Sequence, residues 1–369
     1  MKEGWEVKKI KDICDKATSN IAQNKLLGMS GDYPVFGASG YVQNVDFYHR
    51  DKPYIGVVKD GSGVGRVNIY PAFSSILGTL QYILPKKGYL IGYVAYALKG
   101  LNLAKFASGA AIPHIYFKDY GEEKISVPPL PEQSRIVEEL DLLSNIIEKK
   151  RQQLSELDNL AQSIFYDMFG DPVTNEKGWE VKKLGEFCQI SSSKRIYANE
   201  YCEEGIPFYR GKEITEKSKS NDISVELFIS AKKYEELKDK FGVPKIGDIL
   251  ITAVGTIGNI WVVDTDEPFY FKDGNVLWLQ MKSDINPVYF KFLLEILIDK
   301  YKTAMANGCA YSALTIVNLR EMGTNLIPLN LQQLFAKKIE AIEIEKKLIK
   351  QSIAETEELF NSRMDYYFN

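Results

Sequence analysis

The chain has 369 residues, of which 45% are hydrophobic and 26% charged, a composition typical of soluble globular proteins. Lys and Arg total 46 against 49 Asp and Glu, so no overall basic excess draws the chain to nucleic acid or to an anionic membrane. Any surface for DNA must therefore be a local patch. The longest apolar stretch, 89–98, is far shorter than the roughly 20 residues that span a bilayer, and no apolar signal core opens the chain. We therefore expect a cytoplasmic protein without a membrane partner.

The thiols and imidazoles are sparse. Four cysteines form no C-x-x-C pair, and the only two histidines lie far apart in the sequence. This pattern argues against a disulfide scaffold and against a histidine-rich metal site. The sequence predicts no metal or cofactor bound by this chain.

The sequence repeats itself. GWEVKKI at Gly4–Ile10 returns as GWEVKKL at Gly178–Leu184, and PLPEQ at 129–133 corresponds to PLNLQ at 328–332. A repeat of this kind predicts two copies of one structural module, about 1–174 and 175–369.

Each copy begins with a mixed α/β region. In the first copy the pattern predicts strands at 53–58 and 80–84 and a helix at 92–105. In the second copy it predicts strands at 247–254, 259–263 and 276–281 and a helix at 287–302. The repeated Glu-Val-Lys segments near the start of each copy are interpreted as charged surface strands.

A glycine-rich segment, Lys59–Arg66, follows the first of these strands. Its backbone N–H groups could cradle a phosphate, but it matches neither the dinucleotide-binding nor the P-loop pattern, and 67–70 after it is typical of a strand. A structural hairpin with a basic tip and a contact to the DNA backbone both remain open. The counterpart at 253–259 keeps the glycines and loses the charges.

Other basic residues are interleaved with aromatic ones, a mixture that suits nucleic acid better than catalysis. Arg is scarce, 8 of the 46 basic residues, which singles out Arg66, Arg195 and Arg210 as candidate guanine readers. For each residue a solvated surface charge is the alternative. The full set of candidate DNA-binding residues is Lys59, Ser62, Arg66, Lys105, Ser108, His114, Lys194, Arg195, Arg210, Lys212, Asn259, Lys272 and Tyr311.

After a proline-rich junction, each copy continues into a long helix, predicted at 129–170 and 328–369. Apolar residues recur at alternating spacings of four and three, as in a coiled coil, although an ordinary core helix is the alternative. Some 38 residues at about 1.5 Å each would make a rod of roughly 55 to 60 Å. The predicted seam consists of Ile136, Leu140, Leu143, Ile147, Leu154, Leu157 and Ile164 in the first helix and Phe335, Ile339, Ile342, Ile349, Ile353 and Phe360 in the second.

No catalytic constellation emerges from the sequence. The single Pro-Pro, at 128–129, has neither the polar residue before it nor the aromatic residue after it that an adenine methyltransferase requires. We therefore predict that this chain is not an enzyme and has no catalytic residues.

Three motifs carry a family resemblance. PPLPEQ at 128–133, MFGDP at 168–172 and N-x-K-G-W at 175–179, together with the two long helices, resemble the specificity (S) subunit of type I restriction-modification systems over essentially the whole chain. The second helix start departs from the pattern, because Asn330-Leu331-Gln332 keeps the Gln and lacks the Glu.

The resemblance implies an α+β (mixed α/β) fold with two target recognition domains, 1–128 and 171–327, and two long helices packed as an antiparallel coiled coil with pseudo-two-fold symmetry. It implies that each domain reads one half of a bipartite, non-palindromic site in double-stranded DNA, while the helices set the spacer and dock two DNA methyltransferase (M) subunits. S-adenosylmethionine would be bound by those subunits, and two restriction (R) subunits that use ATP and Mg²⁺ could join. A coiled-coil protein scaffold without DNA specificity is the alternative.

Overall fold

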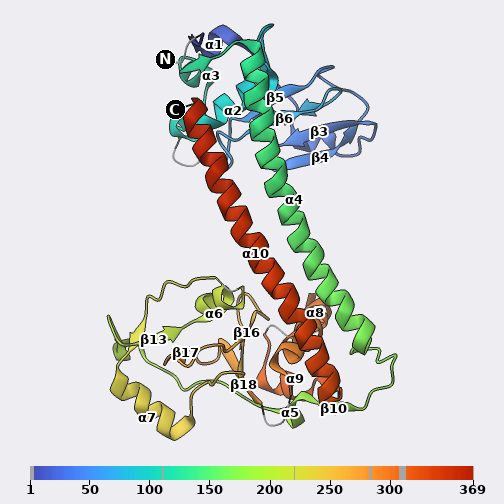
Figure 1. The fold of residues 1–369 in the computed structure, drawn as a ribbon, viewed down its shortest axis with the longest axis vertical. Coiled ribbons are helices and arrows are strands. Elements are labelled where there is room, and N and C mark those ends of the chain that lie inside the picture. Colours follow the sequence, from blue (N-terminus) through green and yellow to red (C-terminus); the bar gives the residue numbers. More distant parts are fainter. Residues whose placement is uncertain (1–3, 110–111, 220, 282–284, 307–312, 369) are drawn as a thin grey trace. The chain divides into compact units, whose positions relative to one another are not determined.

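A computed structural model gives the fold and describes residues 4–109, 112–219, 221–281, 285–306 and 313–368. The chain folds as two compact units, each containing one α/β region and parts of both long helices (Figure 1). Unit 1 comprises Met1–Gln152 and Ile349–Asn369, and unit 2 comprises Gln153–Leu348. Within the described ranges no helix is both long enough and apolar enough to cross a bilayer.

Unit 1 is built on a four-stranded antiparallel sheet of order β2-β8-β5-β6. A second sheet, β4-β3-β7, adds one parallel pair between β3 and β7, and β1 pairs with β9. The elements are β1 (Glu6–Lys9), α1 (Ile10–Ile13), β2 (Cys14–Thr18), η1 (Gln23–Leu26), β3 (Tyr33–Gly37), β4 (Gly40–Val45), β5 (Tyr54–Val58), β6 (Val67–Tyr70), β7 (Ser75–Ile76), β8 (Leu80–Pro85), α2 (Ile91–Gly100), η2 (Leu103–Phe106), α3 (Phe117–Tyr120) and β9 (Lys124–Val127).

Unit 2 repeats this topology with insertions. Its main sheet has the order β11-β18-β15-β16, and β10 pairs with β19 as β1 pairs with β9. The elements are β10 (Val181–Lys183), α5 (Leu184–Phe187), β11 (Cys188–Ser191), η3 (Ala198–Glu200), β12 (Tyr201–Cys202), β13 (Ile206–Tyr209), α6 (Gly211–Ser218), β14 (Phe228–Ile229), α7 (Ala231–Phe241), β15 (Ile249–Thr252), β16 (Ile260–Val262), β17 (Tyr270–Phe271), β18 (Val276–Met281), α8 (Pro287–Ala306), α9 (Ile316–Glu321) and β19 (Gly323–Asn325).

The apolar pattern of β5 explains how unit 1 is layered. All five residues of this strand are buried. Ile55 and Val57 belong to the cluster that contains Val94 of α2, whereas Tyr54 and Val58 belong to the cluster around the second sheet. Because alternate side chains point to opposite faces, a strand covered on both sides is apolar throughout.

The predicted elements of the α/β regions form, with one correction. The strands expected at 53–58, 80–84 and 276–281 are β5, β8 and β18, and the glycine-rich segment joins β5 to β6 as a hairpin. The helix expected at 92–105 is wrong beyond Gly100, where α2 ends and the separate turn η2 follows. Asn102 between them has a left-handed φ of 47°, which an α-helix cannot contain.

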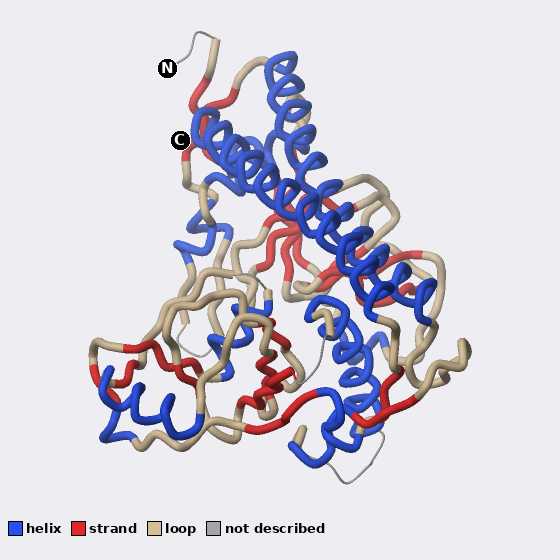
Figure 2. Tube along the Cα trace, turned by 60° about the horizontal axis from the view of Figure 1, so that its bottom comes forward, coloured by secondary structure: helices blue, strands red, loops and turns tan. Residues whose placement is uncertain are grey.

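The long helices α4 (Leu130–Phe169) and α10 (Leu329–Phe368) are unbroken over 40 residues each (Figure 2). In unit 1 the Glu139 carboxylate accepts hydrogen bonds from Arg363 and Tyr367, and the Lys150 ammonium donates to Ser352. As the numbers rise along α4 they fall along α10, so the helices run antiparallel.

The same antiparallel order holds in unit 2. There Asp158 lies 2.7 Å from Lys346, and the rings of Phe165 and Phe335 are 5.6 Å apart at an angle of 83°. Lys150 and Lys346 occupy positions where the spacing of the apolar residues would place another apolar side chain. Their ammonium groups bind Ser352 and Asp158 and do not take part in the apolar contact.

The seam is deepest toward its two ends. Of its predicted residues, Ile136, Leu140, Leu143, Ile147, Phe335, Ile339 and Ile342 are buried, and Leu154, Leu157, Ile164, Ile349, Ile353 and Phe360 are half-buried. Near the end of α4, Ile164 packs against the core cluster as a half-buried residue, and Phe165 and Phe169 are buried more deeply than it is. There the helix faces Tyr289 of α8 as well as α10, which shifts the buried stripe toward the aromatic residues.

The glutamine at each helix start is buried. The Gln133 side chain accepts a hydrogen bond from the backbone N–H of Leu90 (2.9 Å) and donates to the carbonyl oxygen of Pro128 (2.9 Å). Gln332 does the same with Asn286 (2.9 Å) and Ile327 (2.8 Å). Each glutamine thus ties the start of a long helix to the start of α2 or α8.

Candidate nucleic-acid interface

The glycine-rich hairpin of unit 1 lies at the end of the main sheet where β5 ends and β6 begins. Its backbone is bonded to the segment that follows η2, because the Gly61 N–H donates to Pro113 and the Ile115 N–H donates to Lys59, both at 2.9 Å. Isolated bridges join His114 to Asp60 and to Ser108. The folding of this segment therefore brings together four predicted residues, Lys59, Ser62, Ser108 and His114.

Gly65 fixes the hairpin against η2. Its φ is +86°, and a Cβ placed there would lie 2.5 Å from the backbone nitrogen of Ala104. Gly258 of unit 2 has a φ of +89°, and its Cβ would lie 2.6 Å from the side chain of Ile298 on α8. Only glycine permits this conformation at this closeness. In each copy the hairpin thus packs closely on a helical segment through a glycine, on the backbone of η2 in unit 1 and on side chains of α8 in unit 2. In unit 1 this packing places Arg66 and Lys105 on neighbouring segments.

The cations of unit 1 differ in how they are neutralised. Lys59 lies 3.5 Å from Asp60, and Lys105 lies 3.3 Å from Glu123. The exposed Arg66 donates to the carbonyl oxygen of Gly63 at 3.3 Å and has no ion pair within the described part of the chain. Of these three candidates, Arg66 is consequently the cation best presented to an anionic ligand.

In unit 2 the predicted residues gather at the equivalent end of the main sheet. Arg195 follows β11 and donates to Asp273 at 2.9 Å, which raises the pKa of its guanidinium. Lys272 lies 3.6 Å from the other oxygen of the same carboxylate. Lys194 lies over the ring of Phe241, 4.8 Å from its centroid. These three cations share one short stretch of surface.

Arg210 precedes α6 and is held by two carboxylates. It lies 2.7 Å from Glu213 and 2.9 Å from Glu226. Burial by itself would raise the pKa of Glu213, but the hydrogen bonds from Arg210 keep it below its usual value. Lys212 also pairs with Glu226, at 2.9 Å, and lowers the pKa of that carboxyl. Arg210 must therefore exchange these partners before it can bind a guanine, which makes it a poorer reader than the sequence indicates.

Asn259 is a further predicted residue of this region. The Asn259 amide donates to Thr215 at 3.1 Å and to the carbonyl oxygen of Thr256 at 3.0 Å, so it stabilises the hairpin between β15 and β16. Tyr311 lies outside the residues that the structure describes.

Apart from Lys105, which lies in η2, the predicted residues that the structure describes lie at corresponding places in the two units. We call this place the loop edge; it consists of the loops 19–22, 38–39, 59–66, 77–79 and 107–109 with 112–114 in unit 1, and 192–197, 210–212, 253–259 and 272–275 in unit 2. In both units the hairpin donates the same backbone hydrogen bond to the segment before β8 or β18. The Lys59 N–H donates to Thr79 (2.9 Å), and the Ala253 N–H donates to Asn275 (2.8 Å). The two units thus present the same backbone arrangement with different side chains, which suits two ligands that are similar but not identical.

Sequence reasoning missed several polar residues of the unit 1 edge. Asn20, Gln23, Ser39 and Thr79 line a groove there, together with the 62% exposed Tyr41. They are uncharged and scattered over three segments, so no basic or repeated pattern could indicate them.

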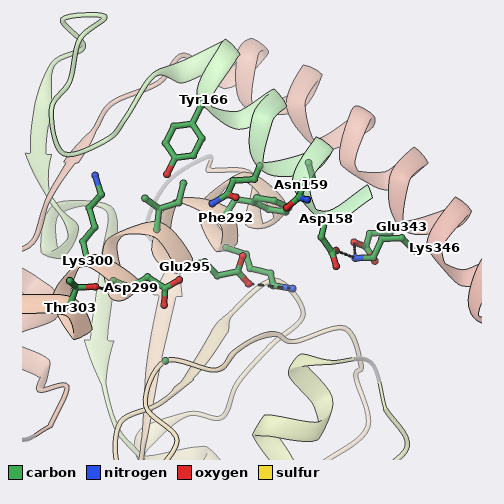
Figure 3. Close-up of a pocket in the computed structure, with 15 residues that line it drawn as sticks. Asp158, Asn159, Tyr166, Phe292, Glu295, Asp299, Lys300, Thr303, Glu343 and Lys346 are labelled. Carbon is green, nitrogen blue, oxygen red and sulfur yellow. Dashed lines mark hydrogen bonds and ion pairs between the residues drawn. The ribbon is translucent and has the colours of Figure 1, made fainter. Parts of the chain in front are cut away.

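A separate hollow of about 560 Å³ lies in unit 2 between α4, α8 and α10 (Figure 3). Its charges pair with each other: Lys346 lies 2.7 Å from both Asp158 and Glu343, and Lys291 lies 3.8 Å from Glu295. Because four acidic side chains line the hollow against three lysines, we interpret it as a joint between helices and not as an anion site. Within the described residues no cluster of His, Cys, Asp and Glu is arranged to hold a metal ion.

Comparison with known proteins identifies the class. A family model for the type I restriction modification DNA specificity domain matches residues 2–159 and again 176–358. A type I restriction enzyme specificity subunit of Haemophilus influenzae is 26% identical over 381 residues, covering 99% of this chain and 95% of that protein. The MjaIX specificity subunit of Methanocaldococcus jannaschii is 24% identical, and the match spans 64% of each chain.

Solved structures share the fold. The S subunit of a type I restriction-modification system from M. genitalium superposes with a TM-score of 0.62 at 18% identity, covering 99% of this chain and 96% of that one. A chain from a study of complex assembly and conformational transition of the type I R-M system gives a TM-score of 0.58 at 16% identity, covering 100% and 98%.

The chain belongs to the type I restriction-modification specificity subunits. It has the two-domain α/β fold with two long helices that the sequence predicts, and members of this family recognise DNA without catalysing its modification. The comparisons give no support to the alternative of a scaffold without DNA specificity.

Proposed function

We propose that each unit reads one half of a bipartite DNA site through its loop edge, and that the paired helices set the spacer between the halves. The target recognition domains are then 1–128 and 171–327. The observation that carries the proposal is the repeated loop edge. The two main sheets have the same strand order, and in each a hairpin packs on a helix through a glycine. The side chains at this end differ between the two units.

The two halves of the site are unequal. The edge of unit 1 combines Lys59 and Arg66 with neutral polar groups, whereas the edge of unit 2 carries Arg195 and Lys272 and gains α6, which follows β13 directly. Because direct readout depends on which donors and acceptors meet the base edges, different edges read different sequences. A non-palindromic target follows.

The chain works within a larger assembly in this proposal. Two methyltransferase subunits bind along the paired helices and carry S-adenosylmethionine, and the assembly leaves room for two restriction subunits that use ATP and Mg²⁺. The family membership supports this assignment, as does the similarity to a chain from an assembled type I system. This chain determines which DNA sequence the assembly recognises.

The direct test is single-molecule sequencing of DNA from cells that express this chain with its methyltransferase subunit, scored for N6-methyladenine. We expect one bipartite motif with unequal halves, which disappears when this chain is omitted. A stable complex that methylates without a motif would refute the reading function.

Substitution of the unit 1 cations should weaken DNA binding without changing the motif. Lys59→Ala and Arg66→Ala each remove a positive charge, and a phosphate contact carries no sequence information. Each should reduce the slope of log K against log salt by about 1. Binding of the assembled complex to target and non-target duplexes at several salt concentrations measures this. If Arg66→Ala relaxes one position of the motif, Arg66 is a base reader and not a phosphate contact.

A further inference from the structure

A groove of about 720 Å³ lies in the loop edge of unit 1. One wall is the segment from Asn20 to Gln23, the other is the turn from Ala38 to Tyr41 between β3 and β4, and the floor is 77–79. The floor is bonded to the first wall, because the Gly78 N–H donates to Ile21, and to β3 just before the second wall, because the Leu77 N–H donates to Phe36, each at 2.8 Å. The groove is therefore a fixed part of the fold.

The lining carries no charge, since no Lys, Arg, Asp or Glu contributes to it. The polar side chains of Asn20, Gln23, Ser39 and Thr79 are exposed, and none of them has a hydrogen-bond partner among the described residues. Glycines at 37, 40 and 78 belong to the lining and add no side chain to it. A ligand can thus approach the backbone closely and meet unoccupied donors and acceptors on both sides.

The groove continues into the glycine-rich hairpin. The carbonyl oxygen of Thr79 accepts hydrogen bonds from the backbone N–H groups of Lys59 (2.9 Å) and Asp60 (3.3 Å). A DNA strand whose phosphates meet Lys59 and Arg66 therefore has the neutral groove directly beside it. Phosphates are bound mainly by cations and base edges by amides and hydroxyls, so the two parts suit different parts of one strand.

We propose that this groove takes one strand of the first half-site and that Asn20 and Gln23 read its bases. The inference rests on the proposed function and assigns specificity to particular residues within it. An amide can donate to N7 and accept from N6 of adenine at the same time, which is the preferred pairing of Asn and Gln. The first half-site should accordingly contain adenines at the positions that these two amides contact.

The test uses the assembled methyltransferase complex and two nearly isosteric substitutions, Asn20→Asp and Gln23→Glu. Each removes the donor to N7 and keeps an acceptor, so adenine at one position should lose about 5- to 150-fold in preference, with cytosine favoured in its place. The second half and the spacer should stay unchanged. Asn24→Asp, which changes an exposed amide on η1 in the same unit that does not line the groove, is the matched control and should leave the whole motif intact.

A second readout separates base reading from phosphate contact. Asn20→Ala and Gln23→Ala should leave the salt slope of binding unchanged, in contrast to Lys59→Ala. An unaltered motif in both Asn20→Asp and Gln23→Glu, or equal weakening of both half-sites, would overturn the assignment of the groove. A wild-type complex that methylates without a bipartite motif would instead refute the proposed function itself.

Discussion

Insertion of one heptad into each long helix should lengthen the spacer of the target while both half-sites keep their sequences. The insertion points are between Gln152 and Gln153 in α4 and between Leu348 and Ile349 in α10, where the two units divide. Seven helical residues add about 10.5 Å, which corresponds to up to about three base pairs at 3.4 Å each. Seven residues also preserve the apolar seam, because they restore the heptad pattern on both helices. The motif of methylated adenines reports the new spacer directly.

A single insertion is the control. The insertion points lie between two pairs of partners, Lys150 with Ser352 in unit 1 and Asp158 with Lys346 in unit 2. A heptad in α4 alone displaces one pair relative to the other by about two helical turns. Either the contacts of the seam or the packing of one domain on its helices must then break. We expect loss of methylation in the single-insertion variants and its return in the double variant. A double variant that methylates with the original spacer would refute the role of the helices as a ruler.

The sequence predicted the long-range organisation well because that organisation is repeated and periodic. The seam residues recur every three or four positions, and the repeated GWEVKK segment marks the start of each copy. The hairpin at Lys59–Arg66 could also be predicted, since two apolar strands flank a glycine-rich turn. In each case the prediction rests on residues that lie close together in the sequence.

Properties that depend on contacts between distant segments escaped the prediction. Arg210 stood out as a rare arginine, yet its ion pair with Glu226, which follows α6, forms only in the fold. The groove of unit 1 could not be predicted for the same reason, because its polar residues are far apart in the sequence and are uncharged, so they form no recognisable pattern.

The glutamine of the PEQ motif shows how a motif can indicate a family before its physical role is evident. The second copy keeps Gln332 and loses the preceding Glu, and the structure explains the difference. Gln332 repeats both backbone hydrogen bonds of Gln133, whereas Glu132 pairs with Arg135, which lies three residues further along the exposed side of α4. The buried amide is the part of the motif that both copies need.

Replacement of this buried amide should loosen one unit at a time. Gln133 is 1% exposed, and Gln133→Ala leaves the Leu90 N–H and the Pro128 carbonyl without their partner. We expect unit 1 to lose about 2 to 4 kcal/mol of unfolding free energy, because unsatisfied buried polar groups add to the cost of the cavity. Hydrogen exchange should show a faster Leu90 amide and an unchanged Asn286 amide, and Gln332→Ala should show the reverse. Equal effects of both variants on both units would contradict a local role.

Gln133→Glu tests the chemistry of the same contact. A protonated Glu can accept from Leu90 and donate to Pro128 as the amide does, whereas a carboxylate can only accept and would be buried next to a carbonyl oxygen. Burial should raise the pKa of this Glu in the folded state above the unfolded value of about 4.3. Stability is then fully present below about pH 4 and is lost as the pH rises through the raised folded pKa. Amide exchange of Leu90 in Gln133→Glu should therefore approach that of wild type in acid and that of Gln133→Ala at neutral pH, and a difference from wild type that does not change with pH would show that the donated hydrogen bond is not what anchors the helix.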